Sequence, residues 1–115
     1  MPHAIIRGGA DPSALFEEFS SWKETEADGS VIEARCAYLR KDERVMLIQT
    51  LAVELGPAQH FFVAVEHKRE QLSVRLHPHP TPTRTPAVQR AVLKVARWVL
   101  EFGGEVEKTN LDLGN

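Results

Sequence analysis

The stretch ERVMLIQTLAVELGP, residues 43–57, decides the fold of this chain. As a strand it would be apolar on both faces, whereas as a helix its apolar residues recur at helical steps along one broad side. The ends favour the helix, because Asp42 can cap its start and Gly56-Pro57 is typical of a helix that stops. The run of about fourteen residues is long for a strand and normal for a helix. We predict a helix here, with a strand in a four-stranded meander as the alternative.

A predicted hairpin lies on each side of this segment. Before it, Asp28-Gly29 is a strong turn signal, and the arm that follows alternates so that Cys36 lies on the buried face. After it, two alternating runs join at Arg69-Glu70, which places Val65 opposite Val74 and gathers the apolar residues of both strands on one face. The sequence therefore predicts antiparallel strand pairs before and after the central helix.

Two further helices are predicted from the residues at their ends. The first is short and amphipathic, and it starts at Asp11 with Pro12 in its first position. The last starts at Thr85 and ends at Gly103-Gly104, because paired glycines readily adopt the left-handed backbone that stops a helix.

These elements define the predicted architecture. The order is α-ββ-α-ββ-α, which predicts an α+β fold with one four-stranded antiparallel sheet and three helices packed on one face. We predict an N-terminal arm at residues 1–10, a single domain at residues 11–104 and a C-terminal tail at residues 105–115.

Composition and charge exclude several classes of function. The 115 residues suit one domain, and a net charge of −2 gives no reason to expect nucleic-acid binding. Serine-triad, P-loop and dinucleotide-binding patterns are absent. The start, MPHAIIRGG, is too short and polar for a signal peptide, and no apolar run approaches the roughly 18 residues of a membrane helix. The single cysteine, Cys36, cannot form an internal disulfide, so we predict a cytoplasmic protein without a membrane partner.

Several short motifs follow one another in the order of a known family. They are WKETE from Trp22, CAYLRKDE from Cys36, AVELG from Ala52, HFFVAV from His60 and LSVRLH from Leu72, followed by the helix from Thr85. Taken with the predicted element order, they resemble the pterin carbinolamine dehydratase family over roughly residues 15–102. The resemblance implies a homodimer or homotetramer, and a pterin site made by a His-His-Pro motif after the middle helix and a third histidine after the last strand.

The residues at those positions depart from the family pattern. Counted from Glu54, the His-His-Pro positions hold Ala58, Gln59 and His60, and the candidates for the third histidine are His77 and His79. Neither a methyl group nor a carboxamide can transfer a proton at neutral pH. The resemblance therefore implies weak or absent dehydratase activity and no cofactor.

A catalytically degenerate branch of that family assists RuBisCO assembly in carboxysomes, and the chain resembles it. We therefore expect a non-catalytic assembly factor, or chaperone, for a partner protein, with RuBisCO as the implied partner. The alternatives are an active pterin-4a-carbinolamine dehydratase and a regulator that touches nucleic acid through its basic last helix.

Two surfaces are predicted to bind that partner. Arg90, Lys94 and Arg97 recur at helical spacing opposite the apolar stripe of the last helix, with Arg84 before them, and form either a docking surface or a solvated face. Phe62 lies on the open face of the predicted sheet. With its neighbours this face is more apolar than a solvated face needs, and the residues assigned to it are Phe62, Ala64, Ser73, Arg75, Ala37 and Leu39.

The histidines near the strand ends raise the question of a metal site. In the predicted hairpin His60 faces His79, and three imidazoles with His77 could bind zinc. Histidines at loops and strand ends are commoner than ligands, so we expect no metal.

Overall fold

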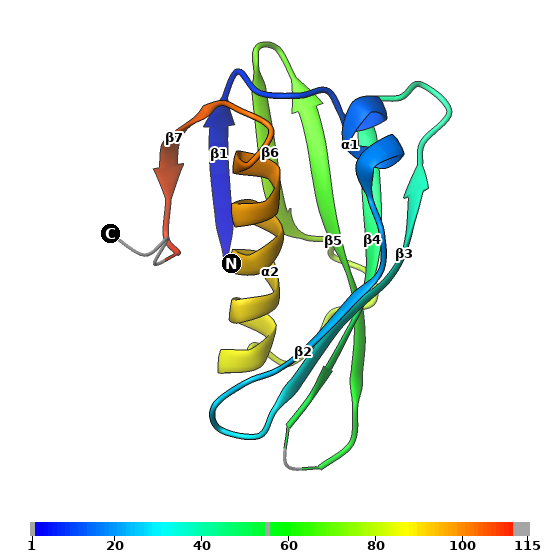
Figure 1. Cartoon of the computed structure of the whole chain (residues 1–115), viewed down its shortest axis with the longest axis vertical. Coiled ribbons are helices and arrows are strands. Elements are labelled where there is room, and N and C mark those ends of the chain that lie inside the picture. The colour runs from blue at the N-terminus through cyan, green and yellow to red at the C-terminus, as the bar shows by residue number, and fades with distance from the viewer. Residues whose placement is uncertain (1, 55, 112–115) are drawn as a thin grey trace.

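The computed structural model describes residues 2–54 and 56–111, and in this part of the chain seven strands form one antiparallel sheet with two helices (Figure 1). The strand order is β2-β3-β4-β5-β6-β1-β7. The elements are β1 (His3–Arg7), α1 (Pro12–Glu18), β2 (Trp22–Thr25), β3 (Val31–Leu39), β4 (Val45–Val53), β5 (Gln59–Lys68), β6 (Gln71–Leu76), α2 (Pro86–Leu100) and β7 (Glu105–Thr109). The predicted four-stranded sheet with three helices is wrong, because the chain is mostly β.

The central difference lies at β4, where a helix was predicted. Val45–Val53 pairs along its length with β3 and with β5, so both rows of its backbone groups are used by neighbouring strands. Asp42 does not cap a helix, because its carboxylate accepts from the backbone N–H of Arg44 at 3.0 Å within the turn before β4. The helix-forming composition of the segment is overridden by pairing on two sides and by burial, as often happens for central strands.

Both predicted hairpins and both terminal helices are confirmed as elements. Val65 lies opposite Val74 in the β5–β6 pair, and Arg69 takes a positive φ of 59° in the turn between them. The hydroxyl oxygen of Thr85 accepts from the N–H of Val88 at 3.3 Å and caps α2, with proline at the start of the helix. These local signals therefore identified their elements correctly.

The segments outside the predicted core of the domain also form strands. β1 lies within the predicted arm and pairs with β6, and β7 lies within the predicted tail and pairs with β1. The turn after α2 depends on Gly104, whose φ is 92°, because a Cβ there would lie 2.7 Å from a methyl carbon of Ile6. Close packing of the two chain ends therefore extends the sheet beyond the hairpins.

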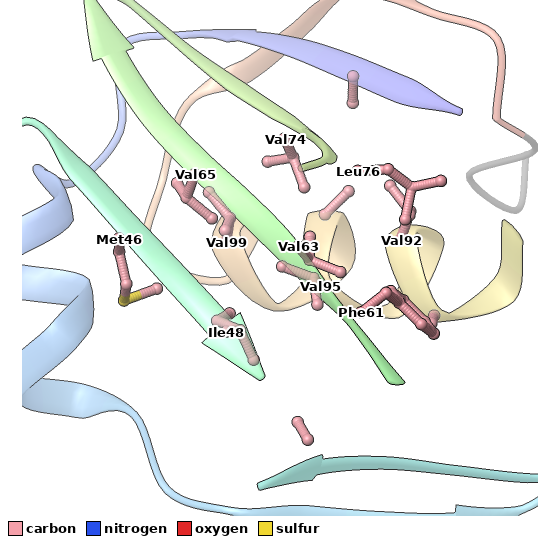
Figure 2. Packing of buried hydrophobic residues seen from close by; sticks show 14 of the residues in the cluster. Met46, Ile48, Phe61, Val63, Val65, Val74, Leu76, Val92, Val95 and Val99 are labelled. Carbon is pink, nitrogen blue, oxygen red and sulfur yellow. The ribbon is translucent and has the colours of Figure 1, made fainter. Parts of the chain in front are cut away.

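The core lies between the sheet and α2. On β4, alternate residues face inward: Ile48 lies near Val63 of β5 and Val95 of α2, and Met46 lies farther along the strand, opposite Val65 (Figure 2). α1 packs on the same face through Leu15, which is fully buried. We call this side of the sheet the inner face, and the side turned away from both helices the open face.

A β-bulge in β3 corrects the prediction for Cys36. Ala34 is opposite Thr50, but Cys36 is opposite Gln49, so one residue is inserted between them and the alternation reverses. Cys36 consequently lies on the open face and not on the buried one. Ala37 and Leu39 shift the other way and pack against the core, so their predicted place on the open face is wrong.

Neither helix in the described part of the chain has the length and apolar character needed to cross a lipid bilayer.

Candidate functional site

The open face carries an apolar row along β4. The side chains of this strand that point away from α2 are every second residue: Val45, Leu47, Gln49, Leu51 and Val53. The neighbouring strands add Phe62 and Ala64 from β5, which lie opposite Gln49 and Leu47. A central strand is thus apolar on both faces, although helices of the described chain cover only one of them. In this row Leu47, Gln49 and Val53 are partly exposed, whereas Val45 and Leu51 are 9% and 8% exposed.

An aromatic strip crosses this face at right angles to the strands. The ring centroids of Tyr38 and Phe62 are 6.3 Å apart, and those of Phe62 and His77 are 6.4 Å apart, each pair in an edge-to-face arrangement. His79 continues the strip, with its ring centroid 6.3 Å from that of His77. Tyr38 is 53% exposed, so the strip presents aromatic surface to solvent in the single chain. Edge-to-face contacts hold these rings in place within the single chain.

Three polar side chains lie close together at the centre of the open face. The thiol of Cys36 donates to Oε1 of Gln49 at 2.9 Å, and its sulfur is 3.4 Å from the hydroxyl of Tyr38. The hydrogen bond with Cys36 raises the pKa of Tyr38, so this phenol stays neutral at physiological pH. Cys36, Tyr38 and Gln49 therefore form one hydrogen-bonded group.

Charged side chains at the margins of the face are matched in pairs. Arg75 of β6 contacts Glu66 of β5 at 2.7 Å, and Arg35 contacts Glu33 on β3 at 3.3 Å. Each of these two pairs is internally neutral, whereas Lys68 and Arg69 add positive charge beside Glu66 and Arg75 near the β5–β6 turn.

The cations predicted on the last helix have partners within the chain. Arg90 lies 3.1 Å from Glu26 and 3.0 Å from Asp28, and Lys94 contacts Glu24 and Glu26. These contacts tie α2 to β2 and to the turn after it. Hydrogen bonds from Ser30, together with Arg90, lower the pKa of Asp28.

Each of the other two predicted cations borders a groove together with one of these residues: Arg97 with Lys94, and Arg84 with Arg90. Arg97 is exposed and borders a groove of about 300 Å³ beside Trp98. Arg84 precedes α2 and borders another groove, of about 400 Å³, with Leu111. Shared grooves and the shared partner Glu26 therefore connect the four cations along α2, and their role in partner binding stays a prediction.

The residues at the dehydratase-like positions are spread over the β4–β5 turn and the start of β5. Ala58 is exposed in the turn, and the side chain of Gln59 bonds to the backbone of Thr83 through both its oxygen and its nitrogen. His60 is exposed opposite Leu51. Of the histidines, the structure brings together His77 and His79. Within residues 2–54 and 56–111, no three His, Cys, Asp or Glu side chains are arranged to hold a metal ion.

Sequence reasoning found Phe62 but missed Tyr38, Leu47 and Gln49 on the same face. Leu47 and Gln49 were assigned to a helix, and Tyr38 to the buried side of its strand. The signal that could have found them is the apolar character of residues 45–53 on both faces, which was used as evidence against a strand.

Comparisons of the chain with protein-family models, with curated proteins and with solved structures found no match. The open face must therefore be interpreted from its own chemistry.

Proposed function

We propose that this protein acts by binding another protein chain and not by catalysis, and that the open face of its sheet is the binding surface. The observation that carries the proposal is the outward row of β4, where leucine and valine side chains stand on the face that neither helix covers.

The reason is the usual relation between strand pattern and cover. A strand that is apolar on both faces is normally buried on both, whereas a strand of a one-sided sheet alternates apolar and polar residues. Here the two helices account for Met46 and Ile48 on the inner face, and nothing in the described chain accounts equally for Leu47 on the other. Contiguous apolar surface on a folded chain typically marks an interaction site.

The side chains of this face also suit a protein partner. Tyrosine and phenylalanine are enriched in the cores of protein interfaces, where they bury large areas at low cost in side-chain entropy. Tyr38 and Phe62 occupy the middle of the face with paired charges at its margins. This arrangement, an apolar centre with a polar rim, is the usual anatomy of an interface.

The proposal keeps the assembly role expected from the sequence and part of its context. A cytoplasmic location belongs to it, supported by the single cysteine. The RuBisCO partner and the alternative dehydratase activity stay predictions. Both rested on a family resemblance that implied a central helix. In this chain the corresponding segment is the strand β4, so the observed element order no longer supports them.

A site-specific photocrosslinker tests the proposal. Phe62 is replaced with benzoylphenylalanine in cells that produce the chain, and the control carries the same group at Phe102, which is 38% exposed but lies after α2. We expect a covalent adduct with protein at position 62, none at position 102, and loss of the adduct when Leu47→Glu is added. Equal yields at both positions, or none at position 62, would overturn the proposal.

A further inference from the structure

We infer that the chain bound by the open face is a second copy of the same protein, related by a two-fold axis that lies between the two sheets and crosses β4 at Gln49. This inference rests on the proposed function and adds the identity of the partner and the register of the contact.

The outward row of β4 reads the same in both directions. From Val45 to Val53 it is Val, Leu, Gln, Leu, Val, with Gln49 at the centre. An axis across the strand at Gln49 reverses the second copy, so Leu47 lies over the partner copy's Leu51 and Val45 over its Val53. Each apolar side chain then meets one of equal size, which is the self-complementarity that a two-fold interface requires.

The central glutamine adds a reason for this register. Its oxygen accepts from Cys36, and its amide nitrogen has no hydrogen-bond partner among the described residues. On the axis, Gln49 of each copy meets Gln49 of the other, and the free N–H groups of each amide can donate to the oxygen of its counterpart. A buried polar pair within an apolar contact penalises shifted registers, because a shift leaves both amides facing leucine.

The charges and the shape of the face both permit a second copy. The pairs Glu33 with Arg35 and Glu66 with Arg75 are internally neutral, so these four side chains do not make two copies repel each other, and Lys68 and Arg69 lie beyond them near the β5–β6 turn. Two copies of one sheet also have the same twist, which lets them pack face to face at about 30°.

The size of the face approaches that of one side of a standard protein interface. With strands about 4.8 Å apart and a rise of about 3.4 Å per residue, β3, β4, β5 and β6, of 9, 9, 10 and 6 residues, present roughly 550 Å². The partners in a standard interface contribute about 800 Å² each. The strands from β3 to β6 therefore provide most of this area, and Tyr38, which projects from the face, adds to it.

The association state of the purified chain tests the identity of the partner. In sedimentation equilibrium at concentrations up to about 100 µM, we expect a dimer for the native chain and at least a roughly 100-fold weaker dimer for Leu47→Glu, because a carboxylate would be buried against leucine. The control is Val106→Glu, at a valine that is 38% exposed on β7, and it should dimerise like the native chain. Circular dichroism shows whether each variant is folded.

A charge exchange tests the register. Tyr38 of β3 is opposite Leu47 of β4, and Glu33 of β3 is opposite Leu51 of β4. The two-fold axis therefore places Tyr38 of one copy over Glu33 of the other. Tyr38→Glu should weaken the dimer about 30-fold through like charges in a partly desolvated contact. Adding Glu33→Lys to the same chain should restore it, because the carboxylate introduced at position 38 of each copy then faces a lysine. Both positions are on the surface of the single chain, so neither change should prevent folding.

The outcomes separate this inference from the proposed function. A native chain that is still monomeric at the highest concentration, or a Leu47→Glu chain that still dimerises, overturns the second copy as the partner, and the photocrosslink at position 62 then decides whether another protein binds the face. A dimer that Leu47→Glu abolishes but that the double variant does not restore overturns the register centred on Gln49.

Discussion

The two faces of β4 carry similar side chains but have different surroundings. On the inner face, Met46 and Ile48 lie beneath the layer formed by α1 and α2 and are at most 1% exposed. On the open face, Leu47 stays partly exposed, and beside it Tyr38 is 53% exposed. The inner row is therefore covered by the chain that contains it, whereas the outer row is only partly covered. In our proposal, apolar residues in one strand serve two purposes, folding on one side and association on the other.

The largest expected difference between the faces concerns the stability of the single chain. Ile48→Ala should lower the free energy of unfolding by about 3 kcal/mol, because it leaves a cavity beneath α2. Leu47→Ala, the matched change on the open face, should cost less than about 1 kcal/mol in the monomer. Urea unfolding at low micromolar concentration measures both. Equal losses would show that the open face is as closely packed within the chain as the inner face.

A smaller effect is expected where β2 is tied to α2 at the margin of the inner face. Arg90 contacts Glu26 and Asp28 from a side chain that is 32% exposed, so Arg90→Ala should cost about 1 kcal/mol of unfolding free energy. Arg97→Ala is the control, since Arg97 is exposed and has no ion pair among the described residues. Added salt should narrow the difference between the two variants. No difference at low salt would mean that these ion pairs do not hold β2 against α2.

The smallest expected effect concerns the turn between β3 and β4, which contains Asp42. A hydrogen bond from Arg40 and another from the backbone of Arg44 lower the pKa of Asp42 from 3.8 to about 2. Because the folded-state pKa is depressed, the ionised carboxylate stabilises the fold above about pH 4, and this contribution is lost as the pH falls toward about 2. An NMR titration of Asp42 should show a midpoint near 2.

The matched variant for this titration is Asp42→Asn. Its stability should depend less on pH than that of the native chain between about pH 4 and about pH 2, and the two should respond alike above that window. A midpoint near 3.8 for Asp42 would contradict the contacts seen in the turn.

Local signals in the sequence identified the elements whose causes are local. Thr85 with Pro86 marked the start of α2, and the turn at Arg69 set the register of β5 against β6. The β4 segment failed because its conformation depends on two neighbouring strands, and its ends, Asp42 and Gly56-Pro57, suit a turn as well as a helix. No sequence pattern marks the bulge before Cys36, because the bulge results from the way β3 pairs with β4.

The candidate site was predicted in part for the same reason. Phe62 was placed on the open face because its hairpin register follows from alternation within β5. Leu47 and Gln49 were not placed there, because the side of the sheet that each residue occupies can be assigned only once the segment is known to be a strand. The apolar residues on the second side of β4 favoured a helix when only the sequence was considered. In our proposal these residues are explained by a second chain that covers the open face.

The reactivity of the single cysteine tests the central claim most directly, because Cys36 lies on the open face beside Gln49 and is half-buried in the single chain. The rate at which iodoacetamide alkylates Cys36 is measured over a range of protein concentrations, for the native chain and for Leu47→Glu. We expect the alkylation rate of the native chain to fall as the protein concentration rises, and the rate of Leu47→Glu to be higher and independent of concentration. A single rate shared by both chains at every concentration would contradict a covered open face.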